Sequence, residues 1–91
     1  MRILAVGDSY MPVRHFKEAL SALEHVHEVF YIEADETSAY APSSASEHRV
    51  TEYLGSPRAL AAAVADVEVL LVHGAPVTAE VLAAGGQLRL V

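Results

Sequence analysis

Two glycine-containing loops carry the side chains that could do chemistry. Residues 7–11 (GDSYM) and residues 73–76 (HGAP) each follow a short apolar run and precede a helix start. In an open α/β sheet, ligands bind where the strands end, and glycine lets backbone N–H groups approach a ligand closely. Each loop also leads to a helix N-terminus, whose free N–H groups favour an anion. We therefore predict that both loops bind a ligand, with Ser9 and Tyr10 as candidate residues in the first loop and His73, Gly74 and Ala75 in the second.

The serine of the first loop allows a different interpretation. The triplet Gly7-Asp8-Ser9 resembles the first block of the SGNH (GDSL-type) hydrolases, in which such a turn presents a serine nucleophile. Ser9 would then attack an ester, with a general base and an oxyanion hole supplied by other groups. That family supplies them from Gly-x-Asn-Asp and Asp-x-x-His blocks. This chain contains no Asn, and no Asp is followed three residues later by His, so both of these blocks are missing. A serine hydrolase with Ser9 as nucleophile is therefore kept only as an alternative.

Other kinds of site have less support in the sequence. His25 and His27 are two residues apart and do not share a helical face, so we predict no metal site there. Asp8 could be the phospho-acceptor of a receiver domain, but His73 stands where such domains have a second Asp. The chain has no G-x-G-x-x-G or Walker loop, so we expect residues 1–91 to bind no dinucleotide by themselves.

Composition narrows the function further. The 91 residues form one small domain, 53% of them are hydrophobic, and the net charge is −6. This acidity argues against nucleic acid as a partner. Without cysteine there is no thiol nucleophile and no disulfide. No apolar run approaches the roughly 20 residues of a membrane span, and the first residues do not resemble a signal peptide. We therefore expect a cytoplasmic protein that does not contact a membrane.

Hydrophobic patterning predicts the elements that position the two loops. Apolar runs predict four strands, over residues 2–6, 27–32, 67–72 and 88–91. After Pro12, apolar residues recur at spacings of three, four and three along one helical face, at Val13, Phe16, Leu20 and Leu23.

Capping signals predict two further helices. Ser56 and Pro57 start a helix that continues through the alanine-rich residues 59–65. Thr78 caps a helix over residues 79–84, which ends at two glycines. Residues 33–46 are predicted to be a loop, and residues 47–54 a short helical turn.

Alternating strands and helices predict an α/β fold with right-handed crossovers. We expect an open parallel sheet with helices on both faces, flavodoxin-like, with four strands. Because an apolar strand at residues 88–91 would leave an unpaired edge, we expect the fold to be incomplete and the chain to be part of a longer polypeptide. A free-standing flavodoxin-like binding module is the remaining alternative.

The most specific motif lies in the last third of the chain. Residues 69–82 (VLLVHGAPVTAEVL) followed by residues 88–91 (LRLV) resemble the D-isomer-specific 2-hydroxyacid dehydrogenases. In that family a strand, a short loop and a Val-Thr helix start precede Leu-(Arg/Lys)-Leu-(Val/Ile). Residues 2–6 (RILAV) and the helix after Pro12 are similar to the branch related to phosphoglycerate dehydrogenase. The resemblance covers nearly the whole chain.

The resemblance implies a function and says which part of the enzyme this chain would be. Residues 1–91 would be the N-terminal part of the substrate-binding (catalytic) domain of an oxidoreductase that transfers a hydride between a nicotinamide cofactor, NAD or NADP, and a small 2-hydroxy or 2-keto acid. The cofactor-binding domain and the catalytic residues would lie beyond this chain, and the parent would be a homodimer. Many relatives have Arg-Ser-Ala-Thr-like residues at positions 73–76, where this chain has HGAP. The loop at His73, Gly74 and Ala75 would face the substrate, and the loop with Ser9 and Tyr10, on the same sheet edge, would line the same cleft.

Overall fold

The computed structural model describes residues 1–34 and 55–91. Its strands are β1 (Arg2–Gly7), β2 (Glu28–Glu33) and β3 (Val69–Val72). Its helices are α1 (Val13–Leu20), the 3₁₀ helix η1 (Ser21–His25), α3 (Pro57–Ala63) and α4 (Ala79–Ala84). The predicted turn over residues 47–54 and most of the predicted loop over 33–46 lie outside the described residues.

The three strands form one parallel sheet in the order β2-β1-β3. In the central strand, Val6 lies beside Ile32 of β2 and Val72 of β3. β1 is the most buried strand, as expected for an apolar strand with neighbours on both edges. The register therefore brings the ends of β1 and β3, and the loops that follow them, to the same edge of the sheet.

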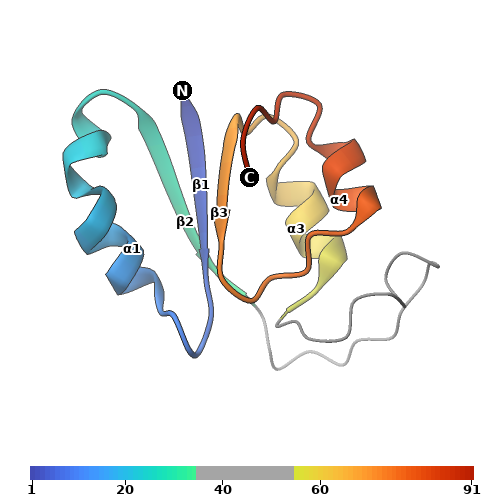
Figure 1. Cartoon of the computed structure of the whole chain (residues 1–91), viewed down its shortest axis with the longest axis horizontal. Helices are drawn as coiled ribbons and strands as arrows, with labels where there is room; N and C mark the ends of the chain where they lie inside the picture. Colours follow the sequence, from blue (N-terminus) through green and yellow to red (C-terminus); the bar gives the residue numbers. More distant parts are fainter. Residues whose placement is uncertain (35–54) are drawn as a thin grey trace.

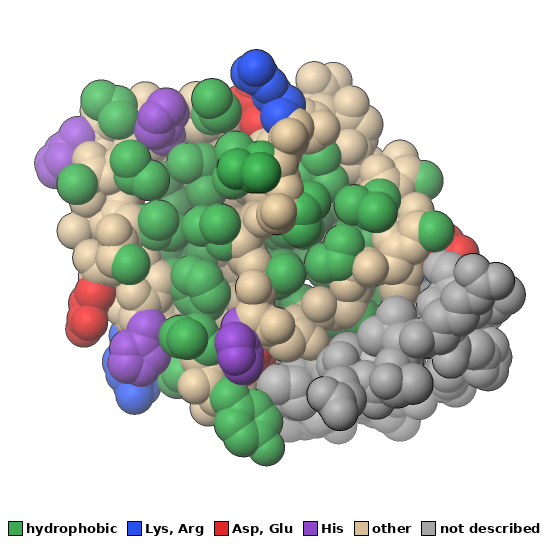
Figure 2. All heavy atoms as spheres, in the orientation of Figure 1, with side chains coloured by type: hydrophobic (Ala, Val, Ile, Leu, Met, Phe, Trp, Pro, Cys, Tyr) green, Lys and Arg blue, Asp and Glu red, His purple; other side chains and the backbone are tan. Residues whose placement is uncertain are grey.

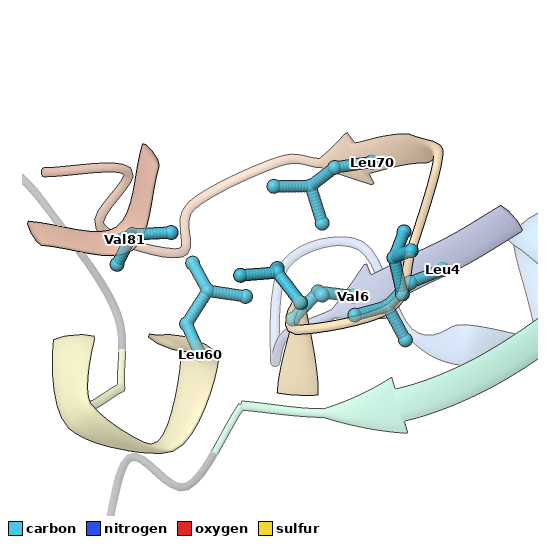
Figure 3. Packing of buried hydrophobic residues seen from close by; sticks show 7 residues of the cluster. Leu4, Val6, Leu60, Leu70 and Val81 are labelled. Atoms are coloured by element: carbon cyan, nitrogen blue, oxygen red, sulfur yellow. The ribbon is translucent and has the colours of Figure 1, made fainter. Parts of the chain in front are cut away.

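Helices cover both faces of this sheet (Figure 1). On one side, α1 packs against β1 and β2 through the predicted stripe, of which Val13, Phe16 and Leu20 are partly buried. On the other side, α3 and α4 lie against each other and enclose the hydrophobic core (Figures 1 and 3). That core comprises Leu4, Val6, Leu60, Val64, Val67, Leu70 and Val81. The predicted parallel α/β sheet with helices on both faces is therefore confirmed.

The predicted count of four strands is wrong, because residues 88–91 do not form a strand. Leu90 makes one parallel bridge with Val69, and its carbonyl accepts a hydrogen bond from the N–H of Leu70 at 3.0 Å. Arg89 donates its N–H to the carbonyl of Glu68 at 2.7 Å. A ladder needs several consecutive pairs, and the segment meets β3 only at this point. It does lie on the free edge of β3, parallel to it.

Local capping explains the helix boundaries. The Ser56 hydroxyl accepts a hydrogen bond from the N–H of Ala59, and the Thr78 hydroxyl accepts one from Val81, which confirms both predicted caps. The first helix is shorter than predicted: α1 ends at Leu20 and η1 continues it. There the Ser21 hydroxyl donates to the carbonyl of Glu18 at 3.3 Å, a side-chain bond that competes with regular helix.

Gly7 ends β1 where the chain has no room for a side chain. A Cβ at this position would lie 2.7 Å from the backbone nitrogen of Val13 and 3.0 Å from the carbonyl oxygen of Met11. Because backbone atoms cannot move aside cheaply, we expect Gly7→Ala to lower the free energy of unfolding by about 1–3 kcal/mol in urea denaturation. Gly86→Ala is the control, since nothing lies within 4 Å of its Cβ. Equal losses in the two variants would contradict the steric explanation.

Candidate functional site

A buried carboxylate joins the two predicted substrate loops. The Asp8 residue, 1% exposed, directly follows β1. Its Oδ1 accepts hydrogen bonds from the N–H groups of Tyr10 at 2.8 Å and Met11 at 2.9 Å. Its Oδ2 accepts one from the N–H of Gly74 at 2.9 Å and lies 3.0 Å from Nδ1 of His73. Asp8 thus shapes its own loop with one oxygen and holds the loop after β3 with the other.

The sheet itself makes this contact possible. β1 and β3 are parallel neighbours, with Val6 paired to Val72, so the residues after both strands emerge side by side. The turn after β1 is closed by the N–H of Asp8, which donates to the carbonyl of Met11 at 3.0 Å. Asp8 and His73 are 65 positions apart in the sequence. They meet because the central strand is next to β3 rather than only to β2.

The hydrogen bonds keep Asp8 ionised despite its burial. Burial alone would raise the pKa of this carboxyl, because a charge is poorly solvated inside a protein. The N–H of Met11, the His73 ring and the N–H groups of Tyr10 and Gly74 act the other way and hold the pKa of Asp8 below its ordinary value. At neutral pH Asp8 is therefore a carboxylate, which can only accept hydrogen bonds.

A second carboxylate occupies the N-terminus of α1. Glu33, the last residue of β2, accepts a hydrogen bond from the N–H of Val13 at 2.7 Å through its Oε1. The N–H groups of Tyr10 and Met11 are already bound to Asp8. The expectation that the first loop and the following helix N-terminus offer free N–H groups to an anion is therefore wrong for Tyr10, Met11 and Val13.

The five predicted substrate residues fall into three groups. Tyr10 is 79% exposed, Ser9 is exposed, and the side chain of His73 is 48% exposed, so all three border solvent at this edge. Gly74 contributes its N–H to Asp8. Ala75 instead packs against the core and lines, with its neighbours, a cavity of about 80 Å³ between β2 and α3. The structure brings His73 and Gly74 together on Asp8, and the assignment of all five to substrate stays a prediction.

Sequence reasoning considered Asp8 in the first loop but did not predict its contact with His73, and it did not single out Glu33. One signal was present for Asp8: an acidic residue directly follows one apolar strand and a histidine follows another. Parallel neighbouring strands place such residues at one edge. No sequence motif near Glu33 predicts that its side chain accepts a hydrogen bond from Val13, 20 positions away, at the start of α1.

Two further findings concern the whole described part of the chain. Within residues 1–34 and 55–91, no three His, Asp or Glu side chains gather as a metal ion would require. Among the same residues, no helix has the length and apolar character needed to cross a membrane.

Comparison with known proteins adds no relative. No protein-family model, no curated protein and no solved structure matches the chain.

The lowered pKa of Asp8 predicts how acid affects folding. Its carboxyl has a lower pKa in the folded chain than in the unfolded chain, where it titrates at its ordinary value of about 3.9. Its stabilising contribution is therefore complete above that value and is lost as the pH falls through the folded pKa. We expect the stability difference between the wild type and Asp8→Asn to be widest near neutral pH and to shrink below about pH 4. Urea denaturation across pH measures it, and a constant difference would contradict this.

Proposed function

We propose that this chain is the N-terminal part of the substrate-binding domain of a nicotinamide-dependent D-2-hydroxyacid dehydrogenase. The parent enzyme would transfer a hydride between NAD or NADP and the C2 carbon of a small 2-hydroxy or 2-keto acid in the cytoplasm, as a homodimer. The observation that carries the proposal is the Asp8–His73 contact at the carboxyl edge of the sheet. It supports the proposal because it holds an exposed polar group where open α/β sheets bind ligands, at the position of this family's substrate-facing loop.

The strand order supports this domain type. Flavodoxin-like sheets have the order 2-1-3-4-5. The sheet of this chain begins 2-1-3, and Leu90 lies parallel to β3 on the edge where a fourth strand would stand.

Exposed apolar side chains also fit a larger assembly. Figure 2 shows hydrophobic side chains over much of one face of the molecule, with most of the charged groups toward its periphery. Across the described residues, large apolar side chains that are exposed include Phe30 at 47%, Leu82 at 50% and Leu90 at 61%. Apolar surface of this kind commonly contacts further protein. In the proposed enzyme, the rest of the polypeptide would cover part of it.

A sequence determination and an assay test the proposal. The gene is expected to encode, after Val91, a strand followed by G-x-G-x-x-G, the fingerprint of a dinucleotide-binding domain. The purified product is expected to oxidise NADH or NADPH in the presence of pyruvate, glyoxylate or hydroxypyruvate, measured by the loss of cofactor absorbance. The proposal is overturned if the gene encodes no such fingerprint and the product reduces none of these acids with either cofactor.

One observation favours a second candidate function. Ser9 follows Asp8 directly, and Asp8 binds an imidazole, so a carboxylate-supported base lies in the same loop cluster as a serine. A serine hydrolase would form a covalent adduct at Ser9 with a fluorophosphonate, detected by mass spectrometry and abolished in Ser9→Ala. Labelling of Ser9 would favour the hydrolase over the dehydrogenase, and an unlabelled Ser9 would exclude it as the nucleophile.

A further inference from the structure

We propose that Asp8 is a positioning residue for His73, and that the protonated His73 imidazole binds the carboxylate of the acid substrate. That the ligand is a carboxylic acid rests on the proposed function. The orientation of the His73 ring by Asp8 is independent of that function, because it follows from the hydrogen bonds of Asp8.

The contacts of Asp8 determine which ring nitrogen of His73 carries the proton. Asp8 is a buried carboxylate held in place by three backbone N–H groups, and it can only accept. Nδ1 of His73 lies 3.0 Å from its Oδ2, so Nδ1 carries a hydrogen and donates it to Asp8. The neutral ring is thereby held as the Nδ1–H tautomer. Since the two nitrogens lie on different sides of the ring, Nε2 is left for a ligand.

In the Asp8–His73 pair, the carboxylate is buried and the imidazole is accessible to solvent. Asp8 is 1% exposed, whereas the His73 side chain is 48% exposed. A ligand at this edge therefore meets the imidazole and not the carboxylate. The negative charge of Asp8 stabilises the imidazolium from behind, as a carboxylate does for a histidine that must gain a proton.

Four backbone N–H groups near this edge already have carboxylate acceptors. The N–H groups of Tyr10, Met11 and Gly74 are bound to Asp8, and that of Val13 is bound to Glu33. Arg2 lies at the opposite edge of the sheet and is paired with Glu28 and Asp66. Within residues 1–34 and 55–91, the titratable and charged side chains at the carboxyl edge, from the elements around His73, are Asp8, Tyr10, Arg14, His15, Glu33, Arg58 and Glu80.

Protonation of His73 changes what its outer nitrogen offers. In the imidazolium, Nδ1–H donates to Asp8 while Nε2–H donates to the substrate carboxylate, a charge-assisted hydrogen bond. In the neutral ring, Nε2 is an acceptor and repels a carboxylate. Acid binding is therefore expected to weaken when the pH is raised and His73 loses the proton on Nε2.

Two NMR measurements on the 91-residue chain test the inference. The ring ¹⁵N shifts of neutral His73 are expected to report the Nδ1–H tautomer, with exposed His25 at the amino edge as an internal control that shows the ordinary mixture. Titration with D-lactate is expected to shift the His73 ring signals at about pH 5.5, with at least about tenfold weaker binding at about pH 8.5. His73→Gln should abolish the effect of pH on lactate binding, and His15→Gln should preserve it.

Each contrary result has a defined meaning. A neutral His73 in the Nε2–H form overturns the positioning role of Asp8. This measurement uses the unsubstituted chain, so it does not depend on whether an Asp8 variant folds. Lactate binding that is absent, or equal at both pH values, overturns the role of His73. Turnover with a KM for the acid that His73→Gln leaves unchanged refutes the inference and leaves the proposed function standing. If lactate binds through His73 but the longer gene product transfers no hydride, the inference stands and the proposed function is refuted.

Discussion

Replacing Asp8 with alanine is expected to lower the free energy of unfolding by about 3–5 kcal/mol, the largest loss at the carboxyl edge. The substitution removes an ionised acceptor, and hydrogen bonds to charged groups contribute more than neutral ones. It leaves the N–H groups of Tyr10, Met11 and Gly74 without their partner. Urea denaturation followed by circular dichroism measures the loss, and faster amide exchange at these three residues locates it.

A matched substitution separates the buried carboxylate from an exposed one. Asp66 lies after α3 and pairs with Arg2 at the opposite edge, with its side chain 69% exposed. Exposed ion pairs contribute little, so Asp66→Ala should cost under about 1 kcal/mol. Asp8→Asn keeps the shape, but its NH₂ group must face either the two loop amides or the donors from the β3 loop. We expect a loss close to that of Asp8→Ala, and equal costs for Asp8 and Asp66 would contradict the central role of Asp8.

Local signals in the sequence predicted the elements well. The apolar run at residues 2–6 became the buried central strand, because a run without polar alternation suits a strand covered on both faces. The caps at Ser56 and Thr78 formed where expected, since each depends on a hydroxyl and an N–H three positions away. Such interactions are complete within a few residues and need no knowledge of the fold.

Features that depend on distant partners were harder to predict. Residues 88–91 have the composition of a strand, but a strand exists only where several consecutive residues pair, and here only Leu90 pairs with β3. The contact of Asp8 with His73 depends on β1 lying next to β3, and the sequence does not specify strand order. The hydrogen bond from the N–H of Val13 to Glu33 is likewise a long-range contact. The predicted loops were therefore brought together, but the carboxylates that organise them were not foreseen as such.

A substitution at the centre of the hydrophobic core should destabilise the protein about as much as the loss of Asp8. Leu70 of β3 is completely buried and packs in the cluster with Leu4, Val6, Leu60 and Val81 (Figure 3). Leu70→Ala removes this side chain from between the sheet and the α3–α4 layer and leaves a cavity. We expect it to lower the free energy of unfolding by about 3–5 kcal/mol in urea denaturation. A small domain has only a thin core, so this is a large share of its stability.

Position decides this effect rather than residue type. Leu82 of α4 carries the same side chain but is 50% exposed, so Leu82→Ala should cost under about 1 kcal/mol. Similar losses in both variants would show that Leu70 is not at the centre of the core. Because β3 ends one residue before His73, loosening the strand should also weaken the hold of Asp8 on that histidine. We therefore expect Leu70→Ala, unlike Leu82→Ala, to speed amide exchange at Gly74, which links the packing of the sheet to the geometry of its carboxyl edge.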